Sequence, residues 1–205
     1  MDSYFTVKGY DREELSIKKS KFIVSVTKVE TEAKAWEFIK AVKDEFSDAT
    51  HNVFAYRIGH DGKTEKQNDD GEPGGTAGKP VLDVIKMEEL TDTVVVVTRY
   101  FGGTYLGAGG LIRAYSTAAK EGIKKAGKSK KNLHKKLKFE IDYSFWGKLQ
   151  NELNNTNVTV KETNFEENVT LTVLVPWSKT DYIKEFVIDL TGGKGEVQEL
   201  GELFI

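Results

Sequence analysis

TVVVVTRYFGGTYLGAGGLIRAYSTAAKEGIKKA, residues 93–126, constrains the backbone more than any other stretch of the chain. Its first part holds four consecutive valines at positions 94–97, and a short β-branched run of this kind is typical of a strand buried on both faces. From residue 111 onward apolar side chains recur at helical spacing. A polar stripe faces the other way and consists of Arg113, Thr117, Lys120 and Lys124. The stretch predicts a central strand, a glycine-rich loop and a helix with one basic face.

Five glycines lie between this strand and this helix: Gly102, Gly103, Gly107, Gly109 and Gly110. Such density is typical of backbone that adopts positive φ, for which Gly107 and Gly109 are the candidates, or that closely approaches another chain or a phosphate. A glycine-rich loop that leads into a helix can hold an anion with free N–H groups. The spacing matches neither G-x-G-x-x-G nor the P-loop. Two interpretations remain: a structural corner or macromolecular contact, which we favour, and a cradle for a small phosphate.

Residues 59–80 are rich in Gly, Asp and Lys and predict a long loop, which in a compact domain is functional or mobile. The loop contains Asp69, Asp70 and Glu72. Three close carboxylates suit Mg²⁺ or Ca²⁺, with His51 expected nearby, but the EF-hand spacing is absent. The alternative, which we favour, is that Asp-Asp-Gly-Glu-Pro caps turns and holds the loop through backbone N–H groups.

The composition limits the possible functions. The 205 residues include 30 Lys and Arg against 32 Asp and Glu, so binding to nucleic acid would need a local basic patch. The absence of cysteine excludes thiol catalysis, disulfides and thiolate metal sites. No signal peptide is evident, and no apolar run approaches the roughly 20 residues that span a bilayer. We expect a cytoplasmic protein with no membrane partner and no cofactor.

The remaining pattern predicts two domains, residues 1–133 and 134–205. In the first, residues 4–29 are expected to form strands, Thr31 to cap a helix that runs to Phe46, His51 to begin another strand, and residues 81–90 to form a short helix. Residues 124–138, rich in lysine, are interpreted as a helix end followed by a hydrophilic linker. The second domain has the order strand, helix, two strands, helix, strand, which is the βαββαβ order of ferredoxin-like sandwiches, a common platform for RNA or protein partners.

Three stretches together closely resemble the signature of the YigZ/IMPACT family. They are HNVFAYRIG from His51, NDDGEPGGTAGKPVL from Asn68 and RYFGGTYLGAGGLIRAYSTA from Arg99. The resemblance covers roughly the first two-thirds of the chain. One departure is Tyr105, at a position where the family pattern leads us to expect lysine, so no required charge is assigned to this position.

The resemblance implies an α+β protein in which an N-terminal ribosomal-protein-S5-domain-2-like domain precedes a C-terminal ferredoxin-like domain. It also implies a role in translation, since the eukaryotic relatives are implicated in controlling initiation by competing for a ribosome-associated activator of an initiation-factor kinase. The family motifs further imply a binding surface. Its candidate residues are His51, Asp69, Asp70, Glu72, Thr76, Arg99, Tyr100, Gly102, Gly103, Gly107, Gly109, Gly110 and Arg113.

We therefore expect a non-enzymatic regulator of translation that binds ribosomal RNA or a ribosome-associated protein. Lys120, on the basic helix face, is added to the candidate surface, because such a face beside the glycine-rich loop can position a phosphodiester without reading bases. The alternative is a metal-dependent phosphate-handling enzyme, a hydrolase or similar to a small-molecule kinase, in which the acidic loop holds Mg²⁺ and Arg113 clamps a phosphoryl group. No residue is identifiable as a nucleophile or base, so we name no catalytic residue.

Overall fold

A computed structural model describes residues 2–205 and divides into two compact units. One unit comprises Tyr4–Lys130, and the other comprises Lys131–Ile205 together with Asp2 and Ser3. The elements up to residue 126 are β1 (Ser3–Val7), β2 (Asp11–Ile17), β3 (Ser20–Lys28), α1 (Glu32–Glu45), β4 (His51–Ile58), β5 (Thr64–Asn68), α2 (Gly78–Met87), β6 (Thr93–Tyr100) and α3 (Ala108–Ala126).

Strand β6 lies at the centre of the first unit's sheet, whose order is β2-β3-β6-β4-β5 with every pair antiparallel. Val97 lies opposite Val24 of β3 and opposite Val53 of β4. All four valines of residues 94–97 are completely buried. The prediction of a central strand covered on both faces is confirmed.

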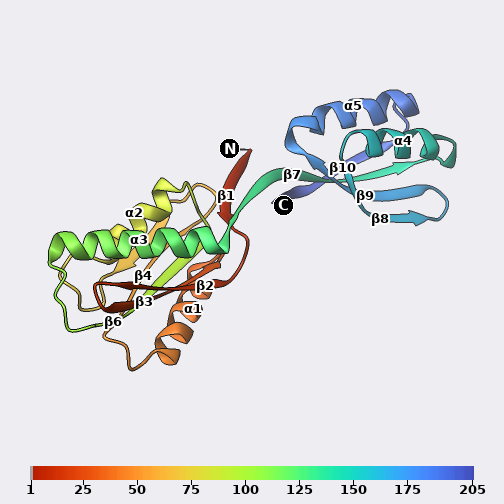
Figure 1. Ribbon diagram of the computed structural model, residues 1–205. Helices are drawn as coiled ribbons and strands as arrows, with labels where there is room; N and C mark the ends of the chain where they lie inside the picture. The colour runs from red at the N-terminus through yellow and green to blue at the C-terminus, as the bar shows by residue number, and fades with distance from the viewer. Residues whose placement is uncertain (1) are drawn as a thin grey trace. The chain divides into compact units, whose positions relative to one another are not determined.

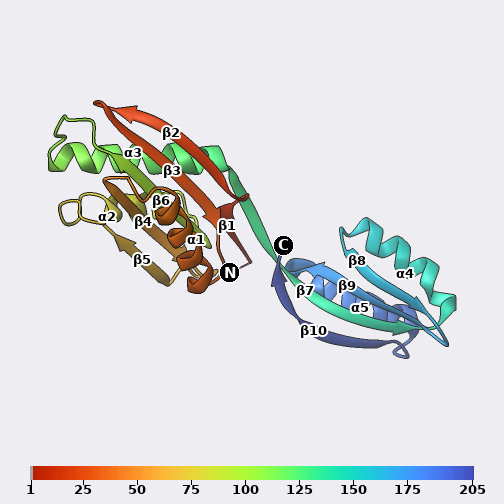
Figure 2. The ribbon, with the colours of Figure 1, turned by 90° about the horizontal axis from the view of Figure 1, so that it is seen from below.

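Alternation along β6 divides the first unit into two cores, because successive side chains of a strand point to opposite faces. Val95 and Val97 pack with buried residues of α2 and α3, whereas Val94 and Val96 pack with buried residues of α1. Figures 1 and 2 show α2 and α3 over one face of the sheet and α1 over the other. Thr31 accepts a hydrogen bond from the backbone N–H of Lys34, so the predicted cap of α1 is confirmed.

The predicted loop of residues 59–80 is partly wrong. It contains an edge strand, β5, and its last residues already belong to α2, which begins at Gly78 and not at residue 81. All five residues of β5 are exposed, so the strand forms through backbone pairing with β4 and leaves no apolar alternation in the sequence. The start of α2 is set by backbone hydrogen bonds to a carboxylate of the acidic loop, which local periodicity does not reveal.

The predicted hydrophilic linker is also wrong. Helix α3 ends at Ala126, Gly127 adopts a φ of 69°, and strand β7 follows directly as Lys128–Ile141. Exposed lysines in the first half of β7 alternate with partly buried residues, which is the period of a strand with one face in solvent. Strand β7 pairs with β9 and β10, which lie far along the sequence. Local composition does not reveal such pairing, and the lysine-rich segment therefore resembled a linker.

The second unit continues with α4 (Tyr143–Asn155), β8 (Thr159–Phe165), β9 (Val169–Pro176), a 3-10 turn at Trp177–Lys179, α5 (Thr180–Thr191) and β10 (Glu196–Phe204). Among the strands of this unit, β7 pairs with both β10 and β9, and β9 pairs with β8, all antiparallel; β1 belongs to the same five-stranded sheet. Helices α4 and α5 cover one face (Figure 1), and their buried residues pack with those of β7 and β9.

These arrangements confirm the predicted fold class, an α+β chain whose ribosomal-protein-S5-domain-2-like unit is followed by a ferredoxin-like βαββαβ unit. Among the described residues, none of the helices combines the length and the apolar character that a membrane-spanning segment needs.

Two glycines of α3 test how closely this helix packs on the sheet. A Cβ added at Gly122 would lie 2.4 Å from Cγ1 of Val24, whereas one added at Gly109 would meet open space. We expect Gly122→Ala to lower the free energy of unfolding by about 1–3 kcal/mol, because the steric conflict outweighs the gain in helix propensity. Gly109→Ala should not lower it. Urea denaturation measures both values, and equal effects of the two substitutions would contradict the described packing of α3 on β3.

Candidate functional site

A pocket of about 400 Å³ lies where β6 ends and α3 begins, and we call it the α3 pocket. Its walls come from the start of β4, the acidic loop after β5, the loop after β6 and the first turn of α3. Four of the predicted site residues line it: His51, Glu72, Arg99 and Gly107. The structure therefore brings together residues that are up to 56 positions apart in the sequence, from 51 to 107.

A buried ion pair forms one wall of the α3 pocket. Arg99 Nη1 donates to Glu72 Oε1 at 2.6 Å, and the two residues are 5% and 8% exposed. The hydroxyl of Tyr115, on α3, donates to the same oxygen at 2.8 Å. Burial, followed by the negative charge of Glu72, raises the pKa of the Tyr115 hydroxyl well above its ordinary value. Since β6, the acidic loop and α3 meet at this one carboxylate, the pair fixes their relative positions within the first unit.

Arg99 retains one unused donor in this wall. Its Nη2 donates to Ser20 Oγ at 3.2 Å, but its Nε has no hydrogen-bond partner, which is true of no other buried side-chain nitrogen or oxygen in residues 2–205. The guanidinium carbon lies 5.6 Å from the ring centres of both Phe22 and Phe101. An unsatisfied buried donor costs about 1–3 kcal/mol.

His51 and Asp70 connect the acidic loop to β4. The Nδ1 atom of His51 lies 2.7 Å from the carbonyl oxygen of Asp70, and because a carbonyl can only accept, Nδ1 must carry the hydrogen. The side chain of Asp70 accepts from the backbone N–H of Asn52 at 2.6 Å and pairs with Lys43 at 2.6 Å. Nε2 of His51 lies 3.8 Å from Glu72 Oε1, so this nitrogen faces the pocket wall.

Asp69 holds the start of α2. Its carboxylate accepts from the backbone N–H groups of Gly75, Ala77 and Gly78 at 2.8–3.0 Å. Burial alone would raise the pKa of Asp69, but these three donors outweigh it and hold the pKa below its ordinary value. Thr76, buried in the same turn, donates its hydroxyl hydrogen to the carbonyl of Pro73 at 2.6 Å.

The three carboxylates of the acidic loop therefore have separate structural partners. Asp69 binds backbone N–H groups, Asp70 binds β4 and Lys43, and Glu72 binds Arg99 and Tyr115. The backbone bonds of Asp69 and Asp70 are of the kind that the turn-capping interpretation predicts, whereas Glu72 is held by side chains. Within residues 2–205 no group of three or more acidic or histidine side chains is placed to hold a metal ion.

The glycines between β6 and the first turn of α3 occupy their positions for different structural reasons. Gly107 is the N-cap of α3 with a φ of 68°, whereas Gly109 lies inside the first helical turn, so the positive φ predicted for it is wrong. The helix begins at Ala108, three residues before the apolar periodicity, because Gly109 and Gly110 are helical without contributing to that pattern. A Cβ at Gly102 would lie 1.9 Å from the carbonyl oxygen of Lys19, so the loop passes directly against the turn between β2 and β3. Gly103 also adopts positive φ, at 79°.

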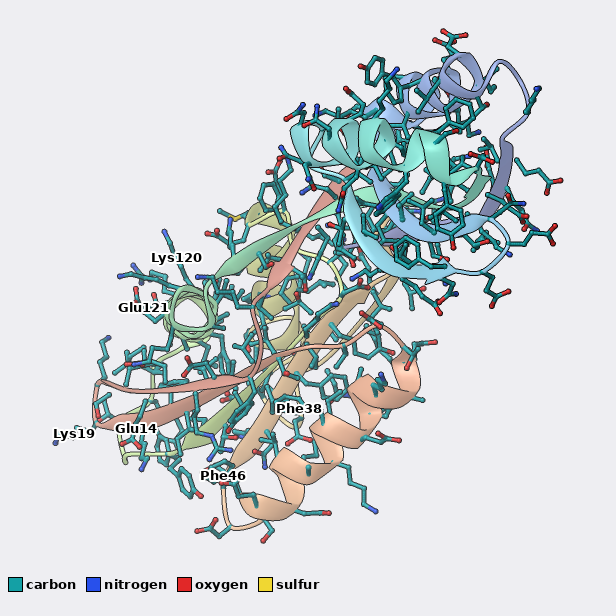
Figure 3. The ribbon with its side chains drawn as sticks, turned by 90° about the vertical axis from the view of Figure 1, so that its right-hand side faces the viewer. Glu14, Lys19, Phe38, Phe46, Lys120 and Glu121 are labelled. Atoms are coloured by element: carbon teal, nitrogen blue, oxygen red, sulfur yellow. The ribbon has the colours of Figure 1, made fainter. Side chains whose placement is uncertain are left out.

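Two of the predicted cations, Arg113 and Lys120, lie outside the pocket. Arg113 is exposed and donates to the carbonyl of Gly109 at 3.2 Å. Lys120 lies twelve residues after Ala108, which is about 18 Å along an α-helix. Figure 3 shows Lys120 on the outer side of α3 and Lys19 at the tip of the β2–β3 turn. Tyr100 likewise does not line the pocket, and its hydroxyl donates to Asp48 at 2.7 Å.

Sequence reasoning missed several residues of the site. Phe101 and Tyr105 form the exposed rim of the pocket, with ring centres 5.2 Å apart. Two aromatic residues close to the glycines of a predicted loop were a usable signal, because a loop offers them little burial. Ser20 and Tyr115 carry no comparable signal, since their contacts depend on the register between β3 and β6 and on the rotation of α3.

We expect Asp69→Asn to lower the free energy of unfolding by about 1–2 kcal/mol at pH 7, because hydrogen bonds to a charged acceptor are replaced by weaker ones. The folded-state pKa of Asp69 is lowered, so its contribution is complete above the unfolded-state pKa, near 3.8, and is lost as the pH falls below it. Urea denaturation of both proteins at pH 7 and at about pH 3 measures the difference. A difference that does not shrink at the lower pH would contradict the assigned role of the charge.

Comparison with known proteins places these elements in a described family. The family model described as Impact N-terminal domain matches residues 18–123, which include the whole α3 pocket, and the model described as Domain of unknown function (DUF1949) matches residues 139–194. A Bacillus subtilis protein described as IMPACT family member YvyE is 45% identical over 203 residues, covering 99% of this chain and 93% of that protein.

Two further similarities extend this result. A Saccharomyces cerevisiae protein described as Protein IMPACT homolog is 31% identical over 111 residues, which cover 53% of this chain and 43% of that protein. A solved structure described as the crystal structure of an hypothetical protein aligns with a TM-score of 0.66 at 26% identity and covers 98% of both chains.

Proposed function

Because this chain belongs to the IMPACT family, we propose that it is a non-enzymatic regulator of translation and that it acts by binding ribosomal RNA. The resemblance to eukaryotic relatives implicated in translation control supports the regulatory part of this proposal. The proposed binding to RNA rests on one end of the first unit. There the β2–β3 turn, the loop after β6 and the start of α3 lie together.

The observation that carries the proposal is a set of unpaired cations beside a pair of exposed aromatic rings. Lys18 and Lys19 are exposed at the β2–β3 turn, and within residues 2–205 no ion pair is formed by either of them or by Arg113. Phe101 and Tyr105 lie on the loop that passes against this turn. Cations position a phosphodiester backbone, and aromatic rings stack on unpaired bases, without reading sequence.

The charges around these cations support binding to RNA. The nearby carboxylates are neutralised locally, since Glu72 pairs with Arg99 and Glu14 pairs with Lys21 at 2.8 Å. The chain can therefore present a positive surface at this end although its formal net charge is −2. A metal-dependent phosphate-handling reaction has no comparable support, because each carboxylate of the acidic loop already has its own partner.

Charge reversal at Lys19→Glu/Arg113→Glu tests this proposal. We expect the double variant to bind a ribosomal RNA fragment at least about tenfold more weakly. We also expect the slope of log affinity against log salt to flatten by about one unit for each lost phosphate contact. Fluorescence anisotropy over a salt series measures both quantities, and co-sedimentation with ribosomes gives a second readout.

A matched control is available on the opposite face of the sheet. Lys34 and Lys40 of α1 are exposed, so Lys34→Glu/Lys40→Glu changes the net charge equally without touching the proposed surface. Equal RNA affinity of the two double variants would contradict the proposal. Loss of ribosome association by Lys19→Glu/Arg113→Glu alone, with unchanged affinity for naked RNA, would show that the partner is a ribosome-associated protein.

A further inference from the structure

The solvent side of α3 carries a row of cations that continues past the surface proposed above. The exposed positions of the helix from residue 113 to residue 125 are Arg113, Thr117, Lys120, Lys124 and Lys125, and none is acidic. Because an α-helix turns once every 3.6 residues, Arg113, Lys120 and Lys124 lie on one stripe, which is about 17 Å long. A polyanion bound at Arg113 can follow this stripe to the other end of the helix.

The stripe ends at a second pocket of the first unit, which has a volume of about 300 Å³ and which we call the α3-end pocket. It lies where the ends of α2 and α3 meet the start of β7. Three lysines form much of its wall. The lining residues are Glu88, Lys120, Ile123, Lys124, Gly127 and Lys128.

A fourth lysine reaches this pocket from the segment after β1. The backbone N–H of Lys8 donates to the carbonyl of Gly127 at 2.9 Å, which fixes the two segments side by side. The side chain of Lys8 follows the same contact, since a Cβ added at Gly127 would lie 3.3 Å from Cδ of Lys8. Lysines from three separate segments of the first unit therefore gather at the end of α3.

The helix dipole explains only part of this cluster. Cations are favourable in the last turn of a helix, and Lys124 lies there, but Lys120 precedes that turn and Lys8 belongs to another segment.

The ion pairs of the cluster leave positive charge unused. Lys128 pairs with Glu88 at 2.5 Å, and Lys124 pairs with Glu121, the single acid of α3, at 3.6 Å. These pairs are partly exposed, and such pairs contribute little to stability. Within residues 2–205 neither Lys8 nor Lys120 forms an ion pair, so the cluster carries charge that the described fold does not neutralise.

The chemistry of the α3-end pocket favours phosphates over a protein partner. The described residues that line it include no aromatic ring, and the one large apolar side chain, Ile123, is only 2% exposed. The pocket therefore lacks the aromatic anchors that are enriched in the cores of protein interfaces. Ammonium groups and hydroxyls, here the lysines and Thr117 of the stripe, are the groups that contact the phosphates of nucleic acids.

We propose that the protein binds a single strand of RNA along α3, with unpaired bases on Phe101 and Tyr105 and the sugar-phosphate backbone running over the stripe to the lysines of the α3-end pocket. This inference rests on the proposed function and deepens it, because it names the ligand as single-stranded RNA of a minimum length. At about 3.4 Å for each stacked nucleotide, the stripe alone corresponds to about five nucleotides.

The test compares two oligouridylates, of about four and about twelve nucleotides, of which only the longer can span the surface from Tyr105 to the α3-end pocket. Lys8 and Lys120 are exposed, so Lys8→Glu/Lys120→Glu changes the cluster without altering the core. We expect this variant to bind the longer oligomer about tenfold more weakly than the wild type and the shorter one equally well. With the longer oligomer, the slope of log affinity against log salt should flatten by about 0.7 for each lost phosphate contact. Fluorescence anisotropy at low salt measures both.

Three controls make the result specific. Lys34→Glu/Lys40→Glu, on α1, makes the same change in net charge and should leave the affinity for the longer oligomer unchanged. A longer strand also binds in more registers, but that gain in affinity would survive Lys8→Glu/Lys120→Glu. The longer oligomer annealed to oligoadenylate should bind more weakly than the single strand, because paired bases cannot stack on Phe101 and Tyr105.

The outcomes separate this inference from the proposed function. It is overturned if Lys8→Glu/Lys120→Glu binds the longer oligomer as the wild type does, if the α1 control loses as much affinity, or if the duplex binds as tightly as the single strand. In each case the proposed function stands as long as Lys19→Glu/Arg113→Glu weakens RNA binding. Binding of the ribosomal RNA fragment without binding of either oligomer also overturns the inference alone. If the fragment and the oligomers all fail to bind, both proposals fail.

Discussion

The buried ion pair between Arg99 and Glu72 is the interaction on which the candidate site depends. Arg99 lies near the end of the central strand β6, and Glu72 belongs to the acidic loop that follows β5. Such a pair must repay a large desolvation penalty, which is possible only with good geometry and additional hydrogen bonds. Tyr115 donates one of these to Glu72, and Ser20 accepts another from Arg99. Strands β3 and β6, helix α3 and the acidic loop are thereby joined at one buried point.

This construction separates two tasks at the same end of the first unit. The carboxylates of the acidic loop maintain structure, since each has a partner in the protein. Within residues 2–205 the exposed cations Lys19 and Arg113 form no ion pair, and the buried Nε of Arg99 has no hydrogen-bond partner. A surface whose own acids are satisfied and whose donors are free is suited to anions. The proposal that this end of the first unit binds RNA rests on that separation of tasks.

The sequence allowed much of the fold to be predicted, because its signals were local. The four valines of β6, the cap at Thr31 and the βαββαβ order of the second unit depend on patterns within a few residues. Strand β5 and the lysine-rich first part of β7 were missed, because they form through backbone pairing with other strands while their exposed polar residues resemble those of loops and linkers.

The site was predictable only in part for a related reason. His51, Glu72, Arg99 and Gly107 were identified through the family motifs and do meet in one pocket, but motifs carry no information on the distance between residues. The predicted positive φ at Gly109 was wrong because glycine is also tolerated in the first turn of a helix. The role of Tyr115 was hidden because an aromatic ring on a buried helix face satisfies the apolar pattern whether or not its hydroxyl has a partner.

The central claim is that the Arg99–Glu72 pair holds the site together, and a double-mutant cycle with Arg99→Met and Glu72→Gln tests it most directly. Urea unfolding at neutral pH gives the stability of the wild type, the two single variants and the double variant. We expect each single variant to lose about 3–5 kcal/mol, because it leaves a buried group of the other residue without its partner. The double variant should lose less than the sum of the two, by about 1–3 kcal/mol. Losses that add to within about 0.5 kcal/mol would show that the two side chains do not depend on each other and would contradict the claim.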